Sequence, residues 1–151
     1  MATIDLRVFI RATPQRIWQI ISDLSGQQRW MVDVRRLDIV SETKSGVGAV
    51  IDLTSELFGL PIVHDLMEIV SWEEPREIGV IHRGQFTGSA HFRLEPVRGG
   101  TIFTWREEFT PPLGFVGELG HRLLVRPHLE RVFLRSLENV RRLAEDVPQR
   151  P

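Results

Sequence analysis

The apolar positions near the N-terminus alternate with polar ones. In Thr3–Ile10 every second side chain is apolar, which indicates a strand with one buried face. Thr13 and Pro14 then predict the start of a helix, because threonine caps helix N-termini and proline suits the first helical position. The apolar residues of 17–21 follow at helical spacing, and 24–30 can add one further turn or two.

A series of strand-like segments occupies the middle of the chain. The apolar patterning predicts six of them, at Val34–Val40, Val47–Phe58, Ile62–Trp72, Glu77–Arg83, Gln85–Pro96 and Thr101–Phe109. Connections rich in Gly, Pro and polar residues separate them. For Ile62–Trp72 the pattern does not decide which face is buried, so either Asp65 or His64 belongs to the buried face.

The C-terminal part of the chain changes to a helical pattern. From about Glu118 to Asp146 the apolar residues fall close to one stripe. Pro127 interrupts the pattern, and since proline lacks a backbone N–H, we expect that the helix either kinks near this residue or begins there. Residues 1–147 are expected to form a single domain and residues 148–151 a frayed tail.

This order of elements has a consequence for the interior. A run of antiparallel strands must bury one face, and the long C-terminal helix is the largest element that can cover it. A single helix of this length does not fill the whole concave face of a curved sheet of six or seven strands. The pattern therefore predicts an α+β fold with a cavity between the sheet and the helix.

Composition narrows the possible chemistry. The 151 residues include 42% hydrophobic and 26% charged residues, as in ordinary globular domains. The 19 basic and 20 acidic residues nearly balance, which argues against nucleic acid as a partner. Cysteine and tyrosine are absent, and Lys44 is the single lysine, in a polar turn. Proton transfer would therefore fall to carboxylates and histidines.

Targeting and membrane segments are not evident in the pattern. The first eleven residues alternate polar and apolar positions and lack the apolar run of a signal peptide. No stretch approaches 18 consecutive apolar residues, so we expect no stable membrane insertion. By elimination the expected location is cytoplasmic. The oligomeric state is left undetermined.

Several short motifs occur together in a suggestive order. These are Ile10–Trp18 at the strand-to-helix entry, Trp30, Gly46-Val47-Gly48, the Trp72–Arg76 turn, and the hairpin made by Phe92–Pro96 and Gly99–Trp105. Together they resemble the START-like, Bet v 1-like (SRPBCC) superfamily, in its bacterial polyketide cyclase/dehydrase and lipid-transport-like branch, over about residues 3–145. Pro127 departs from that pattern.

The resemblance implies a helix-grip fold, in which a seven-stranded antiparallel sheet wraps around a long C-terminal helix, with two short helices after the first strand. It also implies an apolar cavity for a hydrophobic small molecule such as a lipid, a polyketide or an isoprenoid-like compound. The expected ligand-binding residues are Trp30, Leu53, Phe86, Phe92, Phe103, Trp105, Phe115 and Phe133. No cofactor and no metal is expected, because the histidines lack metal-ligand spacing.

Glu107 is the polar residue of greatest interest. It shares one face of its strand with Phe103, Trp105 and Phe109, and three large aromatic residues favour an inward face. A buried carboxylate needs a partner or a raised pKa. Glu107 can therefore be a polar contact or a general acid/base at the cavity, a partner of an Arg in a structural ion pair, or a residue at a strand end that reaches water.

Three functions remain open. The first is binding or carriage of a hydrophobic small molecule. The second is a polyketide cyclase/dehydratase-type enzyme, in which Glu107 and a cavity histidine, His64 or His82, move protons. The third is a partner-binding module with a filled interior.

Overall fold

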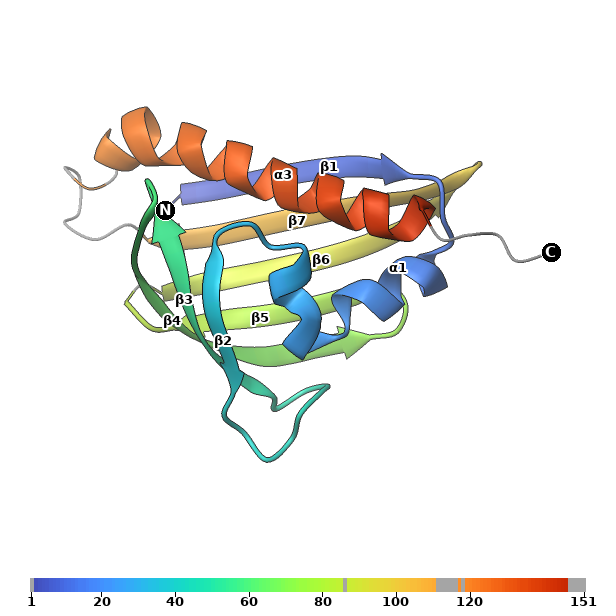
Figure 1. Cartoon of the computed structure of the whole chain (residues 1–151), viewed down its shortest axis with the longest axis horizontal. Helices are drawn as coiled ribbons and strands as arrows, with labels where there is room; N and C mark the ends of the chain where they lie inside the picture. The colour runs from blue at the N-terminus through green and yellow to red at the C-terminus, as the bar shows by residue number, and fades with distance from the viewer. Residues whose placement is uncertain (1, 86, 111–116, 118, 147–151) are drawn as a thin grey trace.

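The computed structural model describes residues 2–85, 87–110, 117 and 119–146 (Figure 1). The candidate residues Phe86 and Phe115 and the predicted tail 148–151 lie outside the described residues. The elements are β1 (Ala2–Ile10), α1 (Pro14–Ile21), η1 (Leu24–Arg29), β2 (Val34–Ile39), β3 (Val50–Leu57), β4 (Leu60–Glu73), β5 (Glu77–Arg83), β6 (Thr87–Val97), β7 (Gly100–Thr110), η2 (His121–Val125) and α3 (Arg126–Glu145).

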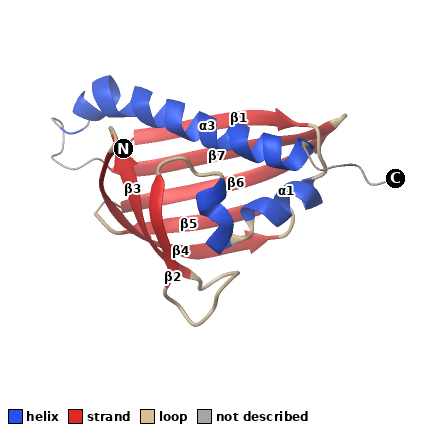
Figure 2. Cartoon of the chain, viewed as in Figure 1, coloured by secondary structure: helices blue, strands red, loops and turns tan. Residues whose placement is uncertain are grey.

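The seven strands form one antiparallel sheet in the order β1-β7-β6-β5-β4-β3-β2. Helix α3 runs across one face of this sheet along β1 and β7 (Figures 1 and 2). Helix α1 lies on the same face, beside the C-terminal part of α3. Strands β2 and β3 curl toward that face, so the sheet is strongly curved. This confirms the predicted α+β helix-grip arrangement, and the described helices cover only part of the concave face.

The local signals at the first helix act as predicted. The Thr13 hydroxyl accepts a hydrogen bond from the Arg16 N–H at 3.2 Å, and Pro14 occupies the first helical turn. The cap satisfies one of the backbone donors that a helix start leaves without a partner. Strand β3 begins later than predicted, at Val50, because Gly46 and Gly48 take positive φ angles of 81° and 97° and form a turn.

Pro127 lies in the first turn of α3, but helical backbone precedes it. Residues 119–120 are helical, His121–Val125 form a wider π-helix, and Val125 has helical angles of φ −79° and ψ −47°. The helical segment therefore does not begin at Pro127. Its hydrogen-bond pattern changes from π to α directly before the proline, which lacks a backbone N–H.

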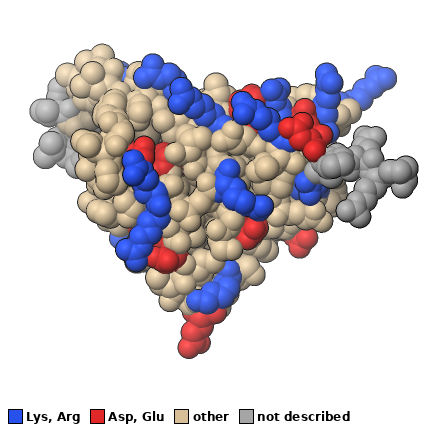
Figure 3. All heavy atoms as spheres, viewed as in Figure 1, with Lys and Arg blue, Asp and Glu red and all other residues tan. Residues whose placement is uncertain are grey.

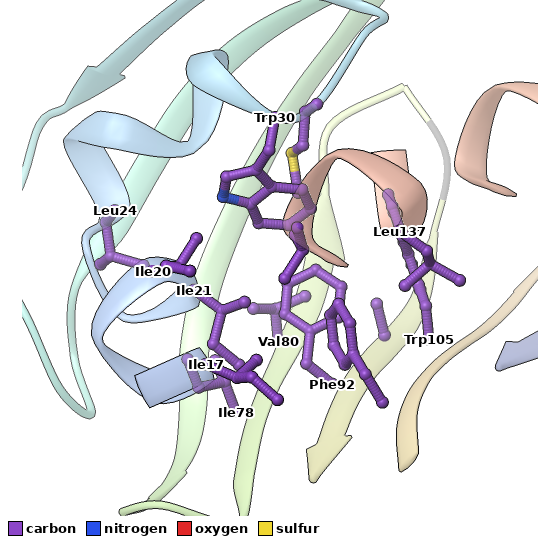
Figure 4. Packing of buried hydrophobic residues seen from close by; sticks show 14 of the residues in the cluster. Ile17, Ile20, Ile21, Leu24, Trp30, Ile78, Val80, Phe92, Trp105 and Leu137 are labelled. Carbon is purple, nitrogen blue, oxygen red and sulfur yellow. The ribbon is translucent and has the colours of Figure 1, made fainter. Parts of the chain in front are cut away.

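An aromatic cluster fills the interior on the side of α3. Trp30 packs edge-on against Phe92 and Trp105, with ring centroids 5.7 and 6.2 Å apart (Figure 4). Trp105 in turn stacks on Phe133 of α3 at 4.2 Å. Two hydrogen bonds join the segment around Trp30 to α3. The Asn139 side-chain amide donates to the Trp30 carbonyl, and the Ser136 hydroxyl accepts from the Val32 backbone N–H.

Trp30 is fully buried in this cluster, which gives a prediction for stability. Trp30→Ala should lower the free energy of unfolding by about 3–5 kcal/mol, because the truncation leaves a cavity among rigid aromatic rings. Trp72→Ala, at a half-buried tryptophan, should cost clearly less. Guanidinium unfolding curves of both variants measure this, and equal losses would contradict the assignment of Trp30 to the core.

Candidate functional site

A cavity of about 580 Å³ lies between the curved sheet and the start of α3. Its wall is formed by the segment after η1, by strands β2 to β5 and β7, by η2 and by the first turns of α3. Most of the wall is apolar, and the apolar side chains that line it are Met31, Val34, Leu53, Leu57, Phe58, Ile62, Val63, Met67, Trp105, Phe109, Leu124, Val125, Leu129 and Phe133. Such a wall provides apolar surface to a ligand and little competition from water.

Three ionisable side chains form a buried row on the wall. Asp65 of β4 bonds to His82 of β5, with 2.5 Å between Oδ2 and Nδ1. The other ring nitrogen of His82, Nε2, lies 3.9 Å from Oε1 of Glu107 on β7. All three residues line the cavity, and each residue as a whole is less than one-tenth exposed. We call this row the acid–histidine cluster.

Strand alternation brings the cluster together. On β4 the buried side chains are Asp65, Met67 and Ile69, so Asp65 points inward and the preceding His64 points outward. This settles the question that the sequence left open for Ile62–Trp72. His64 is exposed on the outer face beside Thr54, so His82 is the histidine of this pair that reaches the cavity.

The residues paired with Glu107 on the two adjacent strands are apolar. Its partners on the neighbouring strands are Ile4 on β1 and Ala90 on β6. Burial raises the pKa of Glu107 from 4.5 to about 7, although the nearby His82 opposes the increase. At neutral pH both forms of this carboxyl group are therefore populated.

His82 experiences opposing influences. Burial disfavours its charged form, but the hydrogen bond to Asp65 and the negative charges of Glu107 and Asp65 outweigh burial and raise its pKa. Asp65 also fixes the ring, because its bond to Nδ1 directs Nε2 toward Glu107. The arrangement can hold a proton at the cavity surface near neutral pH.

Asp33 is a further cavity carboxyl, which the sequence analysis did not single out. It lies between η1 and β2, and its backbone carbonyl accepts a hydrogen bond from the Glu56 N–H at 2.7 Å. Burial raises the pKa of Asp33 to about 6, against a hydrogen bond within its own residue that lowers it. The charge of Asp33 also contributes to the raised pKa of Glu107. No motif in the sequence marked this residue, because a single Asp in a loop is ordinarily solvated.

The hairpin between β3 and β4 contacts the start of α3 at the rim of the cavity. The Phe58 ring stacks on His128 with centroids 4.5 Å apart, and the Phe58 backbone N–H donates to Nε2 of the same histidine at 3.3 Å. Deeper in the wall, His121 packs edge-on against Phe109 at 4.9 Å. These contacts join the sheet to the helix across the cavity.

The expected ligand-binding residues fall into three groups. Leu53, Trp105 and Phe133 line the large cavity. Phe92 lines a small chamber of about 30 Å³ on the far side of Trp105, which shares Glu107 with the large cavity. Trp30 and Phe103 are fully buried and line neither space, since they belong to the aromatic cluster.

The described part of the chain shows no group of three or more His, Asp or Glu side chains placed to hold a metal ion. Among the same residues no helix is both long and apolar enough to cross a membrane. On the face in Figure 3, acidic and basic side chains are interspersed. The acid–histidine cluster, in contrast, brings ionisable side chains together in the interior of the described structure.

The fold agrees with comparison to known families. The family described as "Polyketide cyclase / dehydrase and lipid transport" matches residues 1–145, so the chain belongs to that family. The resemblance to START-like proteins is thereby confirmed. No curated protein matches the chain.

Solved structures share the fold at low sequence identity. The TTHA0849 protein from Thermus thermophilus is 18% identical, with a TM-score of 0.81 over 95% of this chain and 97% of that one. The Zhui aromatase/cyclase from Streptomyces sp. R1128 is 17% identical, with a TM-score of 0.74 over 95% and 93%. The Aha1 dimer from Colwellia psychrerythraea is 17% identical, with a TM-score of 0.68 over 97% and 98%.

The raised pKa of Glu107 predicts how stability depends on pH. A carboxyl whose pKa is higher in the folded state stabilises that state below its unfolded pKa of 4.5 and loses this effect as pH rises through about 7. His82, whose pKa is also raised, acts in the same direction. Glu107→Gln should therefore gain stability relative to the parent protein between pH 5 and pH 8, by about 3 kcal/mol at most.

Chemical unfolding of both proteins at each pH measures this gain. Glu108→Gln provides a matched control, because Glu108 is the next residue on β7 and its carboxylate pairs with Arg106 on the outer face. That variant should follow the parent protein at all pH values. A pH-independent difference between Glu107→Gln and the parent would show that Glu107 is ionised in the folded protein throughout the range.

Proposed function

We propose that the protein binds a largely apolar small molecule in the 580 Å³ cavity, with the polar end of the molecule at the acid–histidine cluster. The volume lies within the range of about 300–1,000 Å³ that is common for small-molecule sites. The family's description, which includes both cyclases and lipid transport, is consistent with such a ligand. The cavity also argues against the third possibility, a partner-binding module with a filled interior.

Apolar burial would supply most of the affinity. Each 100 Å² of apolar ligand surface removed from water contributes about 2.5 kcal/mol before the cost of ordering the ligand is subtracted. The cluster would add orientation, because few polar groups are available among so many apolar ones. The observation that carries the proposal is that the apolar wall of one cavity also contains the buried acid–histidine cluster.

A larger side chain in the cavity wall should weaken the binding of an apolar ligand without unfolding the protein. Leu53 lies on β3 with its side chain in the cavity wall, so Leu53→Trp would place an indole ring in the space that a ligand needs. We expect the affinity for the neutral fluorescent probe N-phenyl-naphthylamine to fall at least about tenfold, a loss of about 1.4 kcal/mol. Fluorescence titration measures the affinity.

Leu66→Trp is the matched control, since Leu66 lies on the outer face of neighbouring β4. It should bind the probe as the parent does. Mass spectrometry of molecules extracted from the purified protein then identifies the natural ligand. If the parent protein binds no apolar probe, or Leu53→Trp binds as well as the parent, the cavity is not the binding site.

A second function is favoured by the contact between His82 and Glu107: acid–base catalysis of cyclase/dehydratase type. A base and an acid that face one cavity suit proton transfer, and burial raises the pKa of Glu107 to about 7. Glu107 as carboxylate would take a proton from the carbon next to a ketone, and protonated His82 would give one to the β-hydroxyl. The carbon–oxygen bond then breaks, water leaves and a carbon–carbon double bond forms. Asp65 would act as a positioning residue for His82.

A simple substrate tests this chemistry. The β-hydroxyketone formed from naphthaldehyde and acetone absorbs more strongly at long wavelength once it loses water, so absorbance follows the reaction. We expect Glu107→Gln to slow the reaction by at least about 100-fold, the usual contribution of a general base. Asp65→Asn should displace the pH–rate profile of the remaining activity, whereas Glu108→Gln should leave the rate unchanged. A cavity that binds the ketone without accelerating its dehydration would support binding alone.

A further inference from the structure

The ionisable groups of the cavity are strongly biased toward one sign. Its wall carries the carboxyl groups of Asp33, Asp65 and Glu107, and Glu56 lies at its edge. Among the described residues that line it, none is Arg or Lys, and His82 and His121 are the groups able to carry a positive charge.

The neighbouring arginines are engaged in ion pairs at the rim of the cavity or outside it. Arg35 pairs with Glu56 and is more than half exposed. Arg106 lies on the outer face of β7, where it bonds to Asp5 and Glu108. Arg126 pairs with Glu130 along α3. Although arginine is abundant in this protein, these side chains leave the cavity without a cationic clamp for an anion.

The carboxyl groups of the wall also favour hydrogen-bond donors. The side chain of Asp65 is 3% exposed and is engaged within the wall, because its Oδ2 bonds to His82 and its Oδ1 is enclosed against Gly84. Asp33 and Glu107 line the cavity as well, and a carboxylate oxygen accepts hydrogen bonds, so this wall favours a ligand that brings an O–H or N–H group.

We propose that the cavity selects apolar ligands whose polar end is a hydrogen-bond donor without negative charge, a hydroxyl or a protonated amine, and rejects carboxylates, phosphates and sulfates. This inference rests on the proposed binding function. An anion would enter a poorly solvated space beside Asp33 and Glu107, where like charges repel strongly. The charge of His82 offers it little compensation, because Asp65 already neutralises that charge at 2.5 Å.

Titration of the wall should modulate this selectivity. Glu107 faces His82, Asp65 and Asp33, and its neighbours on β1 and β6 are the apolar Ile4 and Ala90. As pH rises from 5 to 8, Glu107 and Asp33 lose their protons, since burial holds the pKa of each carboxyl above its ordinary value. A ligand with a fixed positive charge should then gain affinity relative to a neutral one.

Three C12 ligands with different polar ends test the proposal: dodecanol below its solubility limit, and dodecylamine and dodecanoate below their critical micelle concentrations. Their affinities are measured by displacement of N-phenyl-naphthylamine at pH 8. We expect the alcohol and the amine to bind at least about tenfold more tightly than the carboxylate. The ratio of amine to alcohol affinity should also fall at pH 5.

A double variant, Asp33→Asn with Glu107→Gln, locates the effect. It should bring the carboxylate within about threefold of the alcohol, whereas Glu108→Gln on the outer face should keep the discrimination of the parent protein. If the double variant does not fold, the ligand series on the parent protein decides alone. Carboxylate binding equal to that of the alcohol would overturn the inference and leave the binding function intact. Failure of the probe and of all three ligands to bind would instead overturn the binding function itself.

Discussion

The burial of ionisable groups beside an apolar cavity is the constraint on which the site depends. In water, Glu107 and Asp33 would be ordinary carboxylates and His82 an ordinary imidazole. Inside the protein, burial raises the pKa of each carboxyl to about 6 or 7, and the bond from Asp65 to His82 keeps the imidazole chargeable despite its burial. The protein thereby places two carboxyl groups with pKa values of about 6 and 7, and a histidine whose pKa is raised, beside a cavity with an apolar wall.

The sheet is what makes this arrangement possible in structural terms. Asp65, His82 and Glu107 come from β4, β5 and β7, whose backbone hydrogen bonds are already satisfied by the ladder. Each side chain points inward because successive residues of a strand alternate between faces. The cluster therefore requires no irregular backbone, and rigid elements hold its groups within hydrogen-bonding or near-contact distance of one another.

The sequence predicted the fold well because its signals were local and repeated. Period-two alternation, the Thr13 cap and the change to a helical pattern each depend on near neighbours, and the family's motifs added their order. Glu107 was identifiable because three aromatic residues share its face. Asp65 and Asp33 were not, since the inward face of β4 depends on register, and the burial of Asp33 depends on segments distant in the chain. The sequence likewise ranked Trp30 and Phe103 with the ligand wall, because a pattern of buried aromatic residues does not distinguish a packed core from the lining of a cavity.

Strand β7 carries residues of the packed core as well as residues of the cavity wall. Its inward side chains are, in order, Phe103, Trp105, Glu107 and Phe109. Phe103 is packed in the aromatic cluster, and Trp105 stacks on Phe133 of α3 and lines both internal spaces. Glu107 also lines both spaces, and Phe109 lines the large cavity. Because the residues after Trp105 border a cavity, they can serve a ligand without being needed to fill the core.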